Sequence, residues 1–372
     1  MVPEPELNPP APQQDPRPAE PPVAAEYPQS WPSMAPDASS VPPGYLAYPG
    51  YPVPGYAEPP VALAAARPEP LPAEPREYHQ FYRAPAFRWW KPVVAVLLFA
   101  VLEVAFIVVL GVVWVVGTLA SGNPLPQEVV DFDPASLFIV NNVGVAAGLP
   151  IAFLVHRIVF RQRPRWLSSV VGGFRWGPFW RFLAIAGVGL LASTVAQALL
   201  TGGFGELTWN GSSLVLIATI VLTTPFQCAA EEYSVRGLLF RGVGSWFANP
   251  RVGLAVGMVV SSVAFMLLHG AGDPWLNAFY LIVGGLFATL VWRSGGLEAA
   301  VAMHIANNVI SEMLLPFQPD QLSTIFNRQA GVGDPSILIQ MGAVLLVGGL
   351  LLWQSSRLGM VRTAAPAAAT QV

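Results

Sequence analysis

The sequence predicts an all-α, polytopic integral membrane protein with about eight transmembrane helices and a disordered, proline-rich N-terminal tail. Three observations predict this fold class. Of the 372 residues, 53% are hydrophobic and only 11% are charged, which is the balance of a membrane protein. Apolar segments long enough to cross a bilayer recur from residue 93 onward. Prolines crowd the first part of the chain, where no such segment occurs.

Residues 1–85 are predicted to form a disordered cytoplasmic tail. They contain most of the 38 prolines, often in Pro-Pro, Tyr-Pro and Pro-Gly-Tyr steps, and this composition does not build a core. A solvated tether is the favoured interpretation. A proline-recognising partner, which the sequence does not identify, is the alternative. The other predicted regions are an eight-helix membrane domain, residues 86–356, and a short cytoplasmic C-terminal tail, residues 357–372.

The membrane domain begins at an interfacial sequence, Phe87-Arg88-Trp89-Trp90-Lys91. It combines aromatic rings with cations, a composition that settles at the membrane–water interface. The apolar segment directly after it is long enough to span the bilayer with some tilt. Eight spans are predicted in all, at residues 93–120, 137–160, 180–200, 214–240, 252–269, 276–292, 297–315 and 337–353.

Charged residues alternate between the predicted loops. The loops after spans two, four, six and eight carry arginines, whereas those after spans one, three and five carry acidic residues and no cations. Only Arg328, after span seven, breaks the pattern. Because cationic loops stay in the cytoplasm, both termini are predicted to be cytoplasmic, and the expected location is the plasma membrane of a prokaryote. The loop arginines are Arg157, Arg161, Arg163, Arg165, Arg175, Arg181, Arg241, Arg251, Arg293, Arg357 and Arg362.

Two acidic residues and an arginine lie at the end of the predicted fourth span. Each such side chain costs about 3 kcal/mol near the bilayer centre on insertion scales, so the group needs internal partners or a chemical role. Residues four apart share a helix face and neighbours diverge by about 100°, so Glu232 can pair with Arg236 while Glu231 faces elsewhere. A carboxylate in such a setting suits a general base. A buried ion network that only fixes helix packing is the alternative.

Two further polar motifs lie in later apolar segments. Phe265 and His269 are one turn apart in span five, and His304 and Asn308 are one turn apart in span seven. The second pair aims two hydrogen-bond donors in one direction, the geometry that a developing oxyanion requires. Each motif is a weak signal alone, because a lone histidine at a helix end is more often interfacial or a packing residue. Together they indicate a shared site, since each is costly unless the groups meet.

The motifs Glu-Glu-x-x-x-Arg, Phe-x-x-x-His and His-x-x-x-Asn, in this order on successive membrane helices, resemble those of the CPBP family. This family contains CAAX prenyl endopeptidases and bacteriocin-processing, Abi-like proteins. The resemblance covers about residues 214–315, the expected catalytic core, and leaves out the proline-rich tail. It implies an intramembrane endopeptidase that cuts a membrane-associated peptide or protein without a metal.

The resemblance also assigns roles to individual residues. Glu231 and His269 would activate a water for attack on a peptide carbonyl, and His304 and Asn308 would stabilise the oxyanion. Glu232 and Arg236 would hold the site in shape. No metal or other cofactor is expected from the family. The residues alone leave a zinc alternative open, because Glu231, His269 and His304 would make a two-histidine, one-carboxylate ligand set.

Three other classes of function stay open at this point. The chain could be a non-catalytic membrane scaffold or immunity factor of the same family, a zinc-dependent protease, or, least favoured, an ion-coupled transporter. The expected partners are the lipid bilayer and the substrate. With no basic surplus in a net charge of −3, no nucleic-acid partner is expected. Substrate identity, including whether the substrate is prenylated, does not follow from the sequence.

The depth of the site residues tests this interpretation. Counted along upright helices from the cytoplasmic end, Glu231 lies about 15 Å deep, His269 about 27 Å and His304 about 10 Å. Tilted helices, a late start of span five or a deep cytoplasmic cavity would bring them together. A further carboxylate, Glu103 in span one, belongs to no motif, and a packing role, a protonated state or a polar partner on a neighbouring span is expected for it.

Overall fold

The computed structural model describes residues 69–123, 125, 134–318 and 328–366, most of which are helical. The other parts of the two predicted tails, residues 1–68 and 367–372, lie outside the described residues. The long helices are α1 (Trp90–Ala120), α2 (Pro134–Ala146), α3 (Gly148–Val155), α5 (Trp176–Thr201), α6 (Ser213–Glu231), α8 (Pro250–Leu268), α9 (Pro274–Ser294), α10 (Glu298–Glu312) and α11 (Ile337–Arg357). The short elements are strands β1 (Arg76–Glu77) and β2 (Thr363–Ala364), helices α4 (Arg165–Ser168) and α7 (Arg241–Gly244), two 3-10 helices (Tyr78–Gln80 and Leu315–Phe317) and two π-helices (His156–Phe160 and Glu232–Phe240).

The structure confirms an all-α integral membrane protein. In the described part of the chain, seven helical segments are long and apolar enough to cross a membrane, one fewer than the eight predicted spans. The difference is the predicted seventh span. Its helix, α10, has only 15 residues and packs inside the bundle against α5, α6 and α9. Because its neighbours shield it from lipid, α10 can carry several polar side chains.

The outer surface of the bundle is apolar. Helix α1 is the clearest case, since only 6% of its most apolar 18-residue stretch is buried. Such a surface would aggregate in water and suits a hydrocarbon environment. Exposed tryptophans follow the pattern of an interfacial belt, which marks where that environment ends. They are Trp89, Trp90, Trp176, Trp180, Trp209, Trp246 and Trp353.

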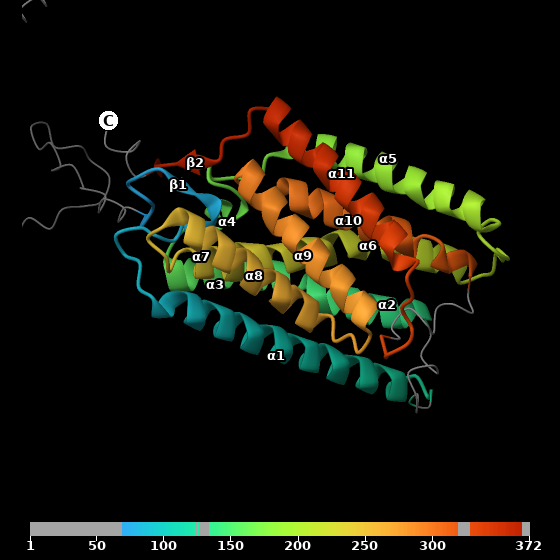
Figure 1. Cartoon of the computed structure of the whole chain (residues 1–372). Coiled ribbons are helices and arrows are strands. Elements are labelled where there is room, and N and C mark those ends of the chain that lie inside the picture. The colour runs from blue at the N-terminus through green and yellow to red at the C-terminus, as the bar shows by residue number, and fades with distance from the viewer. Residues whose placement is uncertain (1–68, 124, 126–133, 319–327, 367–372) are drawn as a thin grey trace, which may run out of the picture. The chain divides into compact units, whose positions relative to one another are not determined.

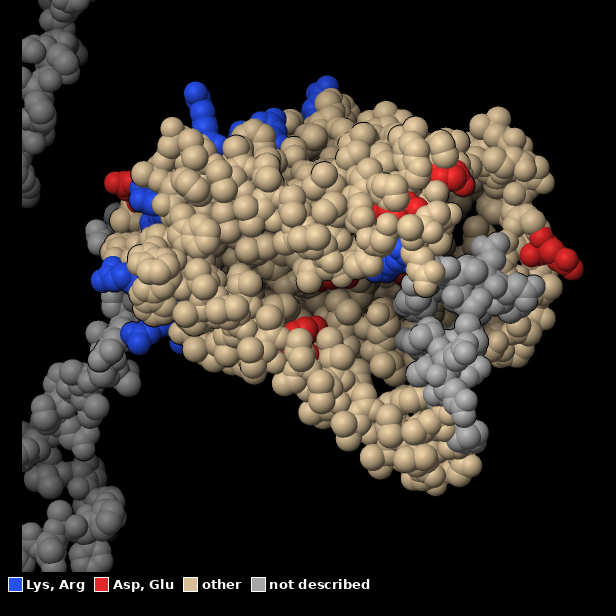
Figure 2. Space-filling view, turned by 60° about the horizontal axis from the view of Figure 1, so that its bottom comes forward, with Lys and Arg blue, Asp and Glu red and all other residues tan. Residues whose placement is uncertain are grey.

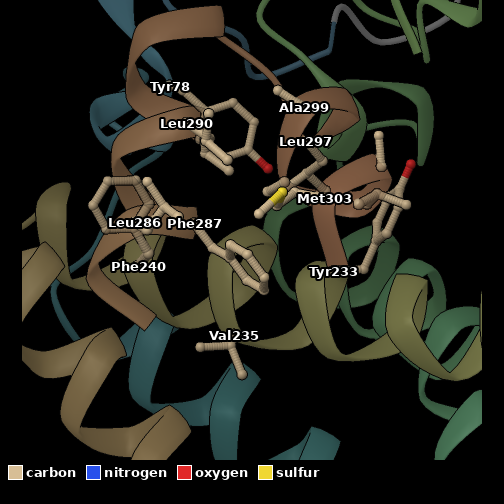
Figure 3. Close-up of a cluster of buried hydrophobic side chains, with 14 of the residues drawn as sticks. Tyr78, Tyr233, Val235, Phe240, Leu286, Phe287, Leu290, Leu297, Ala299 and Met303 are labelled. Carbon is tan, nitrogen blue, oxygen red and sulfur yellow. The ribbon is translucent and has the colours of Figure 1, made fainter. Parts of the chain in front are cut away.

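The hydrophobic core lies where the second π-helix meets α9 and α10 (Figure 3). Phe240 and Val235 come from the π-helix, Phe287 from α9 and Met303 from α10, and all four are at most 4% exposed. Tyr78, from the N-terminal side of the bundle, reaches the same cluster. The π-helix that carries the acidic motif is therefore fixed on several sides by close packing.

Residues 69–85, which the sequence assigned to the disordered tail, pack against the helices. Tyr78, Phe81 and Tyr82 are at most 2% exposed. Strand β1 pairs with β2 in antiparallel register, Arg76 opposite Ala364, so the two ends of the described chain lie side by side. The proline-rich composition around this segment hid its four closely spaced aromatic and histidine residues, which supply the buried surface that a proline-rich tail lacks.

The two ends of the helical bundle differ in charge. Lys and Arg side chains gather toward the end that carries β1, β2 and α7 (Figures 1 and 2), whereas at the other end, among the described residues, the acidic Glu206, Asp273 and Asp334 outnumber the cation Arg328. We call them the cationic end and the acidic end. The cationic end is formed by residues 69–89, 161–175, 245–249, 295–297 and 358–364, and the acidic end by residues 202–212, 269–273, 313–318 and 328–336.

Candidate active site

The acidic motif lies where helix α6 changes into the second π-helix. Glu231 is the last residue of α6, and Glu232 begins the π-helix that continues to Phe240. A π-helix widens the turn and is frequent at functional sites, because it changes which way successive side chains face. The two adjacent carboxylates thereby diverge. The Glu232 side chain is fully buried, whereas that of Glu231 is 21% exposed.

Glu232 and Arg236 form a buried ion pair, as their spacing predicts. Arg236 Nη1 donates to Glu232 Oε1 at 2.8 Å, and both side chains are fully buried. Arg236 Nη2 donates to the carbonyl of Gly284 on α9 at 3.1 Å. The guanidinium also lies over the Phe265 ring at 4.3 Å. The pair therefore connects the π-helix to both α8 and α9.

His304 joins the two carboxylates. Its Nδ1 lies 2.9 Å from Glu232 Oε1, and its Nε2 lies 3.8 Å from Glu231 Oε2. The ring is 3% exposed, packed by Phe265 and Phe287. The sequence paired His304 with Asn308 as donors to one oxyanion. In the structure His304 faces the two glutamates and does not line the cavity described below.

His269 is held by two contacts at the end of α8. Its Nδ1 lies 2.7 Å from the carbonyl oxygen of Phe265, one turn earlier. Because a carbonyl can only accept, Nδ1 carries the hydrogen, and in the neutral ring Nε2 is an acceptor. The ring stacks on Tyr280 of α9, with centroids 3.9 Å apart and planes 26° from parallel. Both contacts fix the direction in which Nε2 points.

A cavity of about 570 Å³ collects most of the predicted site. Glu231, His269 and Asn308 all line it. Asn307 also lines it and donates through Nδ2 to Asn308 Oδ1 at 3.1 Å. This bond engages the Asn308 oxygen, so Nδ2 is the Asn308 atom that is suited to donate to a substrate. A carboxylate, an imidazole acceptor and an amide donor thus face one volume.

The sequence predicts unequal depths for Glu231, His269 and His304. Two features of the structure bring these depths together. The helix that carries Glu231 does not end near Phe240 but runs on through α7 to Gly244, which puts Glu231 up to about 20 Å from the cationic end. Helix α10 begins below the surface, because Glu298 at its start is fully buried and binds Arg175 at 2.6 Å. His304 is therefore deeper than its count along the chain predicts.

Sequence reasoning missed several polar residues of the cavity, among them Gln227, Tyr280 and Glu312. Gln227 donates through Nε2 to Glu231 Oε1, and its own Oε1 accepts from the Cys228 thiol at 3.3 Å. Tyr280 supports His269, and Glu312 accepts from Thr224 at 2.8 Å. The signal for Gln227 was present in the sequence, since it lies one turn before Glu231 on the same helix face. Tyr280 and Glu312 carried no such spacing to a motif residue.

Glu103 lines the cavity from α1, and its Oε2 is buried with no hydrogen-bond partner among the described residues. In the described part of the chain, this atom therefore lacks the polar partner that was one expectation for Glu103.

The zinc alternative requires a suitable ligand set. The described residues contain no group of three or more His, Cys, Asp or Glu side chains arranged to hold a metal ion. Glu231, His269 and His304 do not form such a set in this arrangement.

Comparisons with known proteins agree with the region that the motifs define. Residues 210–310 match the model of a family described as type II CAAX prenyl endopeptidase Rce1-like. The uncharacterized protein YyaK of Bacillus subtilis (strain 168) is 23% identical over 238 residues, which cover 61% of this chain and 78% of YyaK. No solved structure matches the chain. Residues 210–310 of this membrane protein therefore form a domain of the Rce1-like CAAX prenyl endopeptidase (CPBP) family.

Proposed function

We propose that this protein is an intramembrane endopeptidase that hydrolyses a peptide bond in a membrane-associated polypeptide. The observation that carries the proposal is the shared cavity, which Glu231, His269 and Asn308 line from three different helical segments. The match of residues 210–310 to a prenyl endopeptidase family supports the same reaction class. A polar cavity of this kind inside an apolar bundle is costly without a function.

Glu231 is proposed as the general base. Gln227 engages its Oε1, so Oε2, on the side of His304, is the oxygen available to a water. Glu231 takes a proton from this water while the water oxygen bonds to the peptide carbonyl carbon. His269 accepts the second hydrogen bond of the same water through Nε2 and orients it. When the C–N bond breaks, the proton held by Glu231 passes to the leaving amine.

Asn308 is proposed as the donor to the oxyanion. The negative charge that forms on the carbonyl oxygen needs a fixed donor in a place with little water, and the Asn308 amide is held by Asn307 for that purpose. His304 is proposed to act through Glu231 and Glu232, which it contacts, as a positioning residue. Glu232 and Arg236 complete the support of the site.

The orientation in the membrane is proposed from the charges. Arginines follow the positive-inside pattern at the cationic end, where the tryptophans Trp89, Trp176 and Trp353 are also exposed. We infer that the cationic end faces the cytoplasm and that both termini lie there. The plasma membrane of a prokaryote remains the expected location.

A comparison of membrane-protein termini tests the proposed activity. Cells that express the wild-type chain should contain new N-termini that are absent when the chain carries Glu231→Ala. The matched control is Glu206→Ala, which removes an exposed carboxylate at the acidic end and should leave the new termini intact. Both variants must reach the membrane at wild-type abundance and unfold at the wild-type temperature in detergent.

Retention of the same termini in a folded Glu231→Ala protein would contradict the proposal. If no new termini appear, so that cells with the wild-type chain, cells with Glu231→Ala and cells without the protein show identical termini, the non-catalytic scaffold or immunity factor becomes the better interpretation. In that case Glu231→Gln should still support whatever phenotype the gene confers.

A further inference from the structure

The cationic end of the bundle is closed by an aromatic segment of the N-terminal region. Arg241 is fully buried there, with its guanidinium 3.8 Å from the Tyr78 ring centroid, and it donates to the carbonyl of Trp166 at 2.6 Å. Tyr82 donates through its hydroxyl to the carbonyl of Gly237 on the π-helix at 3.2 Å. The ring of Tyr82 stacks on Phe160 at 3.6 Å. This packing lies directly between the π-helix and the cationic end.

A second set of contacts seals the start of α10 at the same end. Leu297 is fully buried, and its amide donates to the carbonyl of Ser168 at 2.9 Å. Glu298 accepts two bonds from Arg175 at 2.9 and 2.6 Å. The amide of Val170 donates to the carbonyl of Gly295. Among the described residues, none from this end lines the cavity that holds Glu231.

At the acidic end, by contrast, the described residues leave a hollow. A second cavity of about 590 Å³ lies there and is lined by Asn141, His269, the glycines Gly270 and Gly272, and residues 328–330. It shares Asn141, His269 and Arg328 with the cavity that contains Glu231. Shared lining residues make the two volumes neighbours, with His269 at the boundary between them.

His269 is itself part of the acidic end. It is the first residue after α8, and its carbonyl accepts from Arg328 Nη1 at 2.7 Å. Asp273 links the same two loops, because it accepts from the amide of Gly331 at 2.9 Å and from that of Trp275 at 2.8 Å. The proposed water-orienting residue is thus held by the loops of one end.

The lining of the cavity suits a hydrated peptide chain. Glu103, Gln227, Asn308 and Glu312 place carboxylates and amides around its wall, while Arg328 places a cation where it adjoins the second cavity. Backbone N–H and C=O groups of an extended peptide require such partners inside a membrane. The hollow with charged side chains inside an otherwise apolar surface is visible in Figure 2.

We propose that the site admits its substrate from the acidic end, and that the substrate is a membrane-anchored polypeptide whose cleaved segment lies on the non-cytoplasmic side. This inference rests on the proposed function and on the orientation argued from the arginines. It sets the substrate apart from a polypeptide whose prenylated C-terminus lies in the cytoplasm, because such a segment would meet the closed cationic end.

Cysteine labelling in intact bacterial cells tests the route of access without using activity. Ser311→Cys places a thiol in the wall of the cavity that holds Glu231, Ala330→Cys one in the wall of the second cavity, and Val361→Cys an exposed one at the cationic end. The parent chain is a suitable background, because its single cysteine, Cys228, is fully buried. The probe is a small, charged, membrane-impermeant thiosulfonate applied from outside, with and without prior permeabilisation.

The first two variants are expected to be labelled from outside, and Val361→Cys only after permeabilisation. Labelling of Ser311→Cys only after permeabilisation, or under neither condition, would overturn the inference, as would labelling of Val361→Cys from outside. The cut sites found by the comparison of termini should map to non-cytoplasmic segments. If the cysteines are labelled as expected but the comparison of termini finds no cleavage, the proposed function is wrong and the access route still holds.

Discussion

Arg236 is a fully buried cation that depends on one carboxylate and one carbonyl. Glu232 balances its charge at 2.8 Å, and Gly284 supplies the carbonyl. Breaking a buried pair by removing one partner leaves an uncompensated charge, which costs about 3–5 kcal/mol. We therefore expect Glu232→Gln and Arg236→Met each to lower the free energy of unfolding by that amount, measured by denaturation in detergent.

The double variant Glu232→Gln, Arg236→Met is the control for this prediction. It removes both charges at once, so it should be more stable than the sum of the two single changes implies. It should still lack activity, because His304 loses its charged partner. Additive losses in the double variant would mean that the two groups do not interact as a pair.

Asn308 provides a second prediction at this scale. A single donor to an oxyanion typically contributes about a 100- to 1000-fold increase in kcat, so Asn308→Ala should lose that factor with little change in KM. Ser311→Ala is the matched control, since Ser311 lines the same cavity but its hydroxyl bonds to helix carbonyls. A loss of less than tenfold in Asn308→Ala, measured on purified protein, would remove Asn308 from the proposed role.

Sequence spacing predicts some contacts of the site residues and not others. The four-residue spacing of Glu232 and Arg236 predicts their contact, because both positions lie within one helix. The orientation of His304 was not predictable, since it depends on how α10 packs against the π-helix. The supporting contact of Tyr280 with His269 joins two helices and has no counterpart in local spacing.

At the scale of elements, helices α8 and α9 approach closely at a glycine pair. A Cβ on Gly284 would lie 3.0 Å from Ser262 Cα and 3.2 Å from its oxygen, both backbone atoms, whereas a Cβ on Gly285 would meet only Ser262 Oγ at 3.8 Å. Gly284→Ala should therefore force the helices apart and cost about 1–3 kcal/mol. Gly285→Ala should be neutral or slightly stabilising, because alanine favours a helix.

The measurement is again denaturation in detergent, with both variants side by side. Gly284→Ala should also reduce activity, because the Gly284 carbonyl is the acceptor for Arg236. Equal stability of the two variants would show that α8 and α9 do not approach each other as closely as this geometry requires.

The link between the two loops of the acidic end should depend on pH. Burial alone would raise the pKa of Asp273, but the backbone amides of Leu276, Gly331, Gly333 and Trp275 donate to its carboxylate and hold the pKa below its ordinary value. A depressed pKa in the folded state stabilises the protein above the unfolded pKa of about 3.9, and this contribution is lost as pH falls through the lower folded value.

Hydrogen exchange checks this prediction. After correction for intrinsic rates, protection of the Trp275 and Gly331 amides should fall as the pH drops below about 4. Asp273→Asn keeps an acceptor but not the charge, so its protection should be lower at neutral pH and insensitive to acid. Protection that rises on acidification in the wild-type protein would contradict the assigned role of the carboxylate.

Elements show where sequence reasoning succeeds and where it fails. Seven spans are recognisable because their outer faces meet lipid, so their composition is apolar throughout. The predicted seventh span, α10, is shorter because it lies inside the bundle, where length is set by packing rather than by bilayer thickness. The π-helix leaves no compositional trace, yet it decides that Glu231 and Glu232 face different surroundings.

At the scale of the whole molecule, the described residues pack closely at the cationic end, which we call the closed end, and leave a cavity at the acidic end. The closed end includes residues 69–85, whose buried aromatic side chains were assigned to a tail because local composition outweighed them. The acidic end includes Arg328, the exception to the charge pattern, which has a structural partner in the carbonyl of His269. The alternation of arginines was readable from the sequence, but the cavity at the acidic end was not, because it depends on the packing of distant segments.

Glu231 is proposed to activate a water that hydrolyses a peptide bond. The most direct test uses purified protein in proteoliposomes, a substrate found by the comparison of termini, and water enriched in oxygen-18, in buffer stripped of metals by a chelator. The wild-type protein is expected to produce a new C-terminus with one oxygen-18 atom in its carboxylate, and a folded Glu231→Gln protein is expected to produce none. Cleavage by Glu231→Gln at the wild-type rate, or loss of wild-type cleavage that zinc restores, would contradict the account.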